Sequence, residues 1–279
     1  MLGTDGIRLG IDKGLQMNNR FKFASILGSI WLALTAVTAF GFDHTHQDFG
    51  QTLSVYLVGG QVKYSELKAA VDSTPNHPFQ RYLRALQEVD RAQFDAFTPN
   101  QQKAFLINAY NSLTIKLILD HYPVASIRDI GGVFSNPWKM EFFSLLSGDI
   151  KALDPIEHEF LRPRYKDYRI HAAVNCASRS CPELRAEPYV AEKLDRQLDE
   201  QMARWLHDPS RNQVDRGGRK ILLSKIFDWY RDDFVAYGGS VDAVIQKHAS
   251  DVFAGAIASK FSTDYLPYSW QLNEYKSAR

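Results

Sequence analysis

The chain has 279 residues, of which 45% are apolar and 13% aromatic, with 33 lysines and arginines against 32 aspartates and glutamates. A formal charge of +1 lacks the basic excess that drives binding to phosphate backbones, so nucleic acid is not an expected partner. The apolar content offsets the entropy of ordering the chain, which excludes an intrinsically disordered protein. Two cysteines are too few for a disulfide scaffold, but they can form one bridge, one reactive thiol or part of a metal site.

The N-terminal segment carries the features of a secretory signal peptide. No charged residue occurs between Lys22 and Asp43, and Arg20 precedes this run. A cationic start, an apolar run and small residues at its end are typical of a signal peptide, with cleavage expected after Ala39 or Gly41. An uncleaved membrane anchor is the alternative, because about 20 apolar residues just span a bilayer.

Met17 opens this signal pattern more naturally than Met1, so residues 1–16 are interpreted as an over-extended start. The predicted organisation is therefore 1–41 for the start and signal peptide, and 42–279 for one mature domain with an N-terminal helical extension. We expect a periplasmic or secreted protein, with a membrane contact only if the signal segment is uncleaved. Its thiols would then face an oxidising compartment.

The clearest element of the mature part is a helix over Pro99–His121. Apolar residues surround nearly its whole circumference, which is typical of a helix that is buried on most sides. Before it, Pro75 and Pro78 separate short amphipathic runs that are expected to be helical. Tyr122-Pro123 ends the buried helix, because the residue before proline avoids helical backbone angles.

Further along the chain the pattern predicts a mixture of helices and strands. Short apolar runs predict strands at Trp138–Leu146 and Arg169–Asn175, and an aspartate followed by proline predicts a short helix over Asp154–Arg162. The later expectations are helices at Glu187–Asp208, Ser224–Tyr237, Ser240–Lys247 and Ser250–Ser259, and strands at Arg219–Leu223 and around Lys260–Leu272. Because helices and strands do not alternate regularly, an α+β fold in one domain is predicted.

The two cysteines lie in a loop of small residues, between a predicted strand and the next helix. Unpaired backbone N–H groups in such a loop, here those of Ala177 and Ser178, can stabilise a thiolate and a developing oxyanion. Three interpretations remain open. Cys176 and Cys181 form a bridge, or they bind zinc together with His171, or Cys176 is a thiolate nucleophile with a histidine base. The zinc interpretation lacks a fourth ligand, and strand alternation turns His171 away from the cysteines.

His158 is the histidine best placed to serve as that base. It lies between Glu157 and Glu159, whose charges could orient its ring, although a solvated histidine on a helix face has the same pattern. The buried helix offers further candidates, because Asn108 and Asn111 are amides in an apolar setting. Such amides either tether backbone groups or face a site.

Three ordered segments resemble the bacterial and plant family named "domain of unknown function 547" (DUF547). They are Phe105–Ile115, Asp154–Arg162 and Ile170–Pro182. The resemblance implies a papain-like or transglutaminase-like cysteine hydrolase, with a small antiparallel sheet packed against a buried central helix. It also implies an action on glutathione or another γ-glutamyl or peptide amide.

Carried over to this sequence, the family's recurring cysteine is Cys176 and its histidine after glutamate is His158. Cys181 matches a position where plant members place serine, which favours a nucleophile over an obligatory bridge. In papain-type enzymes the cysteine precedes the histidine, whereas here it follows, so a permuted arrangement would be needed.

Two hypotheses of different classes follow. In the first, a thiol-dependent amide hydrolase or acyl transferase uses Cys176 as nucleophile and His158 as base, with Asn108 or Glu157 orienting the imidazole. The substrate-binding candidates are then Glu157, Asn175, Ala177 and Ser178. No cofactor or metal is expected, and the partner is a small-molecule or peptide substrate.

In the second hypothesis, the protein is an exported binding module for a small thiol or a peptide, with Cys176 and Cys181 bridged and no chemistry. A regulatory pair that is oxidised at rest and active when reduced lies between these two hypotheses.

Overall fold

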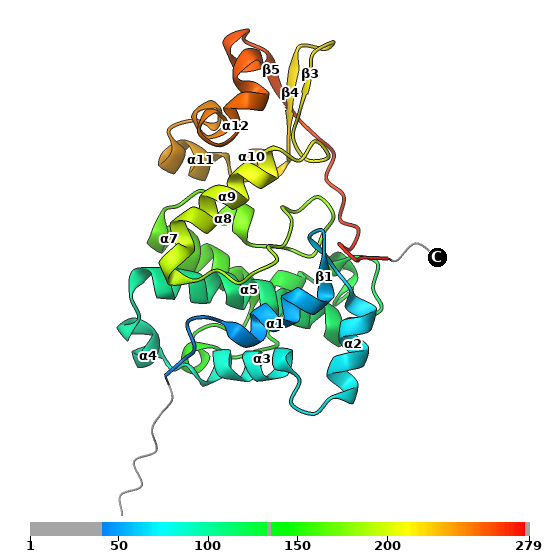
Figure 1. Ribbon diagram of the computed structural model, residues 1–279, viewed down its shortest axis with the longest axis vertical. Coiled ribbons are helices and arrows are strands. Elements are labelled where there is room, and N and C mark those ends of the chain that lie inside the picture. The colour runs from blue at the N-terminus through cyan, green and yellow to red at the C-terminus, as the bar shows by residue number, and fades with distance from the viewer. Residues whose placement is uncertain (1–40, 133–134, 277–279) are drawn as a thin grey trace, which may run out of the picture. The chain divides into compact units, whose positions relative to one another are not determined.

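The structure, a computed structural model, describes residues 41–132 and 135–276. The predicted start and signal peptide lie outside these residues, apart from Gly41. Within the described ranges, no helix is both long enough and apolar enough to cross a bilayer. Helices dominate and two small sheets accompany them, so the predicted α+β class is confirmed (Figure 1).

From residue 41 onward, four helices and a short hairpin precede the central helix. They are α1 (Gln47–Tyr56), β1 (Leu57–Val58), β2 (Gln61–Val62), α2 (Tyr64–Ser73), α3 (Pro78–Glu88) and α4 (Arg91–Ala96). Proline opens α3 in its first turn, where a missing N–H costs nothing, and a capping box at Asp90 opens α4. The buried side chains of these helices join the same apolar core as the helix that follows.

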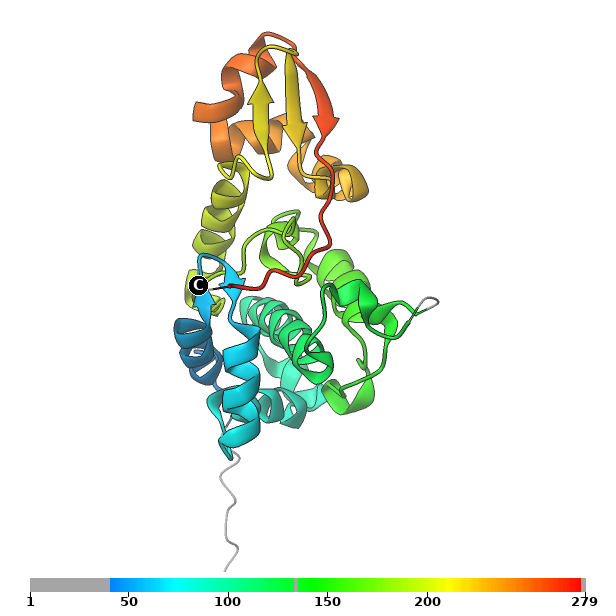
Figure 2. The same ribbon diagram turned by 90° about the vertical axis from the view of Figure 1, so that its right-hand side faces the viewer.

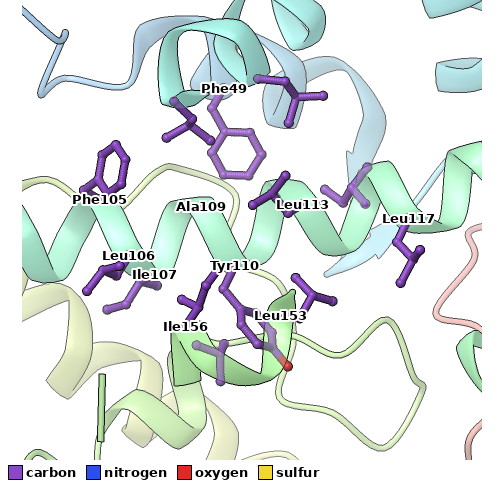
Figure 3. Close-up of a cluster of buried hydrophobic side chains, with 14 of the residues drawn as sticks. Phe49, Phe105, Leu106, Ile107, Ala109, Tyr110, Leu113, Leu117, Leu153 and Ile156 are labelled. Carbon is purple, nitrogen blue, oxygen red and sulfur yellow. The ribbon is translucent and has the colours of Figure 1, made fainter. Parts of the chain in front are cut away.

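Helix α5 (Pro99–His121) has the boundaries that the sequence predicts. A capping box at Thr98 opens it, and every residue from 103 to 115 is buried. Figure 3 shows the reason: Phe49 lies on one side of the helix, whereas Leu153 lies on the opposite side. The predicted burial on most sides of this helix is therefore confirmed.

Two buried amides of α5 hold neighbouring segments by their backbone. The Asn108 side chain accepts from the Tyr189 N–H at 3.0 Å and donates to the Tyr189 carbonyl at 2.7 Å. The Asn111 side chain accepts from the Asn175 N–H at 2.8 Å and donates to the Ala173 carbonyl at 2.9 Å. These paired bonds offset the cost of burying two amides in an apolar helix.

The middle of the chain consists of short helical turns joined by irregular segments. They are η1 (Ile127–Asp129), η2 (Pro137–Lys139), η3 (Leu146–Gly148), α6 (Leu153–Pro155), the π-helical η4 (Ile156–Leu161), α7 (Arg162–Tyr165) and α8 (Ile170–Ala173). The predicted helix over Asp154–Arg162 is confirmed. The predicted strand over Trp138–Leu146 is wrong, because the segment contains η2 and only an isolated bridge from Leu145 to Ile150.

The predicted strand over Arg169–Asn175 is also wrong, because α8 occupies most of it. This short helix lies between two apolar cores: Ile170 and Ala173 pack in the first, and Ala172 packs in the second. A short segment that is apolar on every side has the pattern of a buried strand, and periodicity alone cannot separate the two.

The second core is built by the C-terminal half of the chain. Its elements are η5 (Ala191–Lys193), α9 (Leu194–Leu206), β3 (Gln213–Asp215), β4 (Lys220–Leu223), α10 (Ile226–Trp229), α11 (Arg231–Gly238), α12 (Val241–Ala258) and β5 (Ser262–Tyr265). Helix α9 begins later than predicted, because the bonds from Asn108 keep the Tyr189 backbone out of a helix. Helix α12 is a single element with a break at Ala249, where two helices were expected.

The three-stranded sheet differs from the predicted one in two respects. Strand β4 pairs antiparallel with β3 but parallel with β5, because the chain crosses over through α10–α12 before it returns. Ile221 and Leu223 of β4 pack in the second core beside α12, and not against α5 (Figure 1). The three-stranded sheet is therefore not the predicted antiparallel sheet against the central helix, whereas the antiparallel β1–β2 hairpin contributes Val62 to the core that contains α5.

After β5 the chain returns along the first core as a C-terminal strap, which we define as residues 266–276 (Figure 2). Its backbone donates from Leu272 to the Ala125 carbonyl, from Asn273 to the Ala177 carbonyl and from Tyr275 to the Val62 carbonyl, at 2.8–2.9 Å. The strap therefore links the cysteine loop to the N-terminal hairpin.

The pair of bonds made by Asn111 generates the first prediction. Replacing Asn111 with alanine leaves the Asn175 N–H and the Ala173 carbonyl buried without partners, so the free energy of unfolding should fall by about 2–4 kcal/mol. Urea unfolding followed by circular dichroism measures this change.

Thr114 in the same helix provides the matched control. It is also buried, but its hydroxyl has no partner among the described residues, so Thr114→Val should leave stability unchanged or raise it. Equal losses in the two variants would contradict the tethering role of Asn111.

Candidate functional site

A cavity of about 280 Å³ lies where the two apolar cores meet. Its walls come from α5, η2, η4, α8, the cysteine loop, α10 and the C-terminal strap. The lining residues are Tyr110, Asn136, Trp138, Asp154, Glu157, His158, His171, Val174, Cys176, Cys181, Ile226, Trp229, Tyr230, Tyr268 and Trp270. The cavity therefore gathers both cysteines and two histidines from segments far apart in the chain.

The two cysteines form a disulfide in this structure, with their Cα atoms 6.3 Å apart. The Cys176 Sγ atom lies 3.2 Å from the Tyr268 hydroxyl and 3.3 Å from the Ser178 hydroxyl. The Tyr268 hydroxyl also donates to the Cys181 Sγ atom at 3.4 Å. Two hydroxyl groups therefore lie within hydrogen-bond distance of Cys176 Sγ, where either could donate to a thiolate.

His171 of α8 lines the cavity and is almost fully buried, with 2% of its surface exposed. Its Nε2 atom lies 2.8 Å from an Asp233 carboxylate oxygen, and its ring stacks on Tyr230 at 4.1 Å between centroids. The Nδ1 atom has no hydrogen-bond partner among the described residues. If Nε2 carries the proton that Asp233 accepts, Nδ1 is the basic nitrogen.

Asp233 is held in its charged form by two neighbours. Burial acts to raise its pKa, but hydrogen bonds from His171 and from Arg162 outweigh burial and hold the pKa of Asp233 well below its usual range. The Arg162 guanidinium donates to both carboxylate oxygens, at 2.6 and 3.1 Å. A charged carboxylate in this position accepts a hydrogen bond from the ring and fixes the orientation of His171.

His158 lines the same cavity, but its surroundings differ from those of His171. Its Nδ1 atom lies 2.8 Å from an Arg162 guanidinium nitrogen, and its Nε2 atom lies 3.7 Å from Asp154. About a third of its side chain is exposed. The structure therefore brings His158 and Cys176 to one cavity, with the arginine occupying one of the two ring nitrogens.

Glu157 precedes His158 in η4 and also lines the cavity, with 6% of its surface exposed. One of its carboxylate oxygens lies 4.0 Å from the His171 Nδ1 atom. Burial raises the pKa of Tyr230, and the nearby negative charge of Glu157 raises it further, so that this phenol stays protonated.

The remaining predicted site residues are not among those that line this cavity: Asn108, Asn175, Ala177 and Ser178. Asn108 is not among the lining residues, because both of its polar atoms bind the Tyr189 backbone. The Asn175 side chain accepts from the Ala177 N–H at 2.9 Å and donates to the Pro182 carbonyl at 2.8 Å. Asn175 therefore shapes the cysteine loop, and the Ala177 N–H is already occupied and is not free for an oxyanion.

Sequence reasoning missed the His171–Asp233 pair as a candidate for acid–base chemistry. The strand predicted over Arg169–Asn175 turned His171 away from the cysteines, whereas α8 brings it to the cavity. Asp233 lies 62 residues further along the chain, and nothing in the local pattern distinguishes it from its exposed neighbour Asp232. A histidine inside an apolar run was the one available signal.

The structure places no fourth zinc ligand beside His171, Cys176 and Cys181 in the described part of the chain. No group of three or more His, Cys, Asp or Glu side chains there has a spacing that could hold a metal ion. Two of the three predicted ligands, Cys176 and Cys181, are joined to each other in the disulfide.

Comparison with known proteins gives one match. Residues 94–206 match the family model described as "Protein of unknown function, DUF547", and this confirms the predicted resemblance over that segment. The segment contains Glu157, His158, His171 and both cysteines. No curated protein and no solved structure matches the chain.

The charged state of Asp233 generates a prediction about acid stability. Its pKa is lower in the folded chain than in the unfolded chain, so its contribution to stability is complete above about pH 4 and is lost as the pH falls below that value. The stability difference between the parent protein and Asp233→Asn should therefore shrink between about pH 4 and pH 2, measured by urea unfolding.

The neighbouring carboxylate serves as a control, because Asp232 is exposed. The difference between the parent and Asp232→Asn should stay small across the same pH range. A difference for Asp233→Asn that does not change with pH would show that the carboxylate is not held in its charged form by His171 and Arg162.

Proposed function

We propose that this protein is an exported, thiol-dependent hydrolase or acyl transferase that acts on an amide or peptide bond, with Cys176 as nucleophile. One observation carries the proposal: the buried His171, whose Nε2 is bonded to Asp233 and whose Nδ1 has no partner, lines the same cavity as Cys176. A nucleophile, a base and a carboxylate that orients the base are the parts that such chemistry requires.

In the proposed reaction, the Nδ1 atom of His171 takes the proton of the Cys176 thiol. The thiolate then attacks the amide carbonyl and forms a tetrahedral intermediate. The intermediate collapses to a thioester as His171 returns the proton to the leaving amine. Water or an acceptor amine then attacks the thioester, which gives the acid or a new amide and regenerates the thiol.

His171 takes the role that the sequence gives to His158, and Asp233 takes the role that it gives to Asn108. The papain-like or transglutaminase-like relationship and an action on glutathione or a γ-glutamyl amide remain parts of the proposal. The histidine precedes the cysteine along the chain, unlike in papain-type enzymes, but this does not argue against the mechanism, because such triads are defined by geometry and not by chain order.

The proposal requires the disulfide to open before catalysis. A dithiol reductant would be oxidised as the bridge is reduced to two thiols, which frees Cys176. The bridge then acts as a regulatory pair, oxidised at rest. Cys181, which is 2% exposed, would be the less available of the two thiols.

A second candidate function is supported by the bridge itself. With Cys176 and Cys181 joined, the cavity has no nucleophile, and its largely aromatic lining is suited to holding a small thiol or a peptide. In this case the protein is an exported binding module, and reduction of the bridge would produce no activity.

Turnover of amino-acid p-nitroanilides, before and after reduction with a dithiol, separates the two candidates. We expect activity only after reduction, and we expect Cys176→Ser and His171→Gln each to lower kcat/KM by about a thousandfold, because each removes a group that the reaction needs. Cys181→Ser should be active without any reductant.

His158→Gln is the matched comparison, because it makes the same change at the other histidine of the cavity. We expect kcat/KM to fall by less than about tenfold in this variant. Loss of activity with His158→Gln but not with His171→Gln would show that His158, and not His171, is the general base. Full activity in all of the cysteine and histidine variants would refute the thiol mechanism.

A further inference from the structure

The cavity lining has an unbalanced charge. It includes the carboxylates of Asp154 and Glu157, but no lysine and no arginine. The guanidinium of Arg162 is outside the lining, and each of its nitrogens has a partner: two donate to the oxygens of Asp233 and the third lies 2.8 Å from the His158 Nδ1 atom. A ligand that brings a positive charge would therefore meet two carboxylates in the lining and no lysine or arginine side chain there.

Glu157 is the stronger of the two carboxylates as a binding group. Its side chain is 8% exposed, whereas the Asp154 side chain is 29% exposed. Among the described residues it forms no ion pair with lysine or arginine, and the closest basic atom is the His171 Nδ1 at 4.0 Å. The Tyr230 phenol is a hydrogen-bonding neighbour of Glu157, and the charge of Arg162 also acts on this carboxylate. A buried carboxylate is costly unless cations or several hydrogen bonds accompany it, so a cation inside the cavity would stabilise Glu157 further.

Aromatic rings form much of the surrounding wall. The rings of Tyr268, Trp229 and Trp270 contact one another, with centroids 4.7–5.9 Å apart, and Trp138 meets Trp270 at 5.5 Å. Trp229 is 45% exposed, which is unusual for so large an apolar side chain. The faces of tryptophan and tyrosine attract cations, and clusters of such rings bind ammonium groups.

We infer that this cavity binds its substrate through a protonated amine, which pairs with the Glu157 carboxylate among the aromatic rings. That the cavity binds an amine does not depend on the proposed function. Only the statement that this amine belongs to the amide substrate rests on it. The substrates would then be amides or peptides with a free amino group. Binding itself requires no turnover and no open thiol.

Three probes of similar size test the inference on the mature protein with its disulfide closed: butylammonium, butanol and butyrate. Quenching of tryptophan fluorescence or calorimetry measures their binding. We expect butylammonium to bind at least about tenfold more tightly than butanol, and butyrate to bind most weakly, since an ion pair in a partly desolvated site is worth about that factor. Equal binding of butylammonium and butanol to the unsubstituted protein would by itself overturn the inference.

Glu157→Gln should weaken butylammonium binding at least about tenfold and leave butanol binding unchanged. Glu159→Gln is the matched control, because this exposed glutamate lies in the same turn but does not line the cavity, and it should bind like the parent. If Glu157→Gln fails to fold, Asp154→Asn replaces it with a smaller expected loss. Unchanged butylammonium binding in a folded Glu157→Gln variant would refute the role of Glu157.

A turnover comparison separates this inference from the proposed function. The reduced protein is offered an amino-acid p-nitroanilide with a free amino group and its N-acetylated form. Faster cleavage of the free amine supports both statements. Equal cleavage of both refutes the amine inference and leaves the hydrolase intact, whereas selective butylammonium binding without any cleavage refutes the hydrolase alone.

Discussion

The site depends on a single side chain of the buried helix α5. Asn111 accepts from the Asn175 N–H and donates to the Ala173 carbonyl, so one amide is hydrogen-bonded to the backbone on both sides of residue 174. The short segment held in this way carries His171 just before it and Cys176 just after it. Because α5 is enclosed by the first apolar core, the position of both chemical groups is set by a rigid element.

The site also depends on the position of α8 between the two cores. Ile170 and Ala173 pack on one side and Ala172 on the other, so the intervening His171 is buried where the cores meet. A histidine in such a position needs a fixed partner, and Asp233 of α11 provides it from the second core. The acid–base pair therefore joins α8, which lies between the two cores, to α11 of the second core.

The sequence predicted those parts of the fold that local chemistry determines. The C-terminal end of α5 follows from Tyr122-Pro123, and the helix over Asp154–Arg162 follows from its own start signals. The segment around His171 could not be predicted, because a short run that is apolar on all sides is compatible with a strand or a helix. Asp233 and Tyr268 reach the site only through tertiary packing, so no local pattern marks them as site residues.

The central claim is that His171 activates Cys176. Its most direct test is the rate at which iodoacetamide alkylates Cys176 near pH 7 in the Cys181→Ser protein. This rate is compared with the rates in the same protein carrying His171→Gln or His158→Gln in addition. The account predicts a fast reaction that slows at least about tenfold when His171 is replaced and changes little when His158 is replaced. Equal alkylation rates in all three proteins would contradict it.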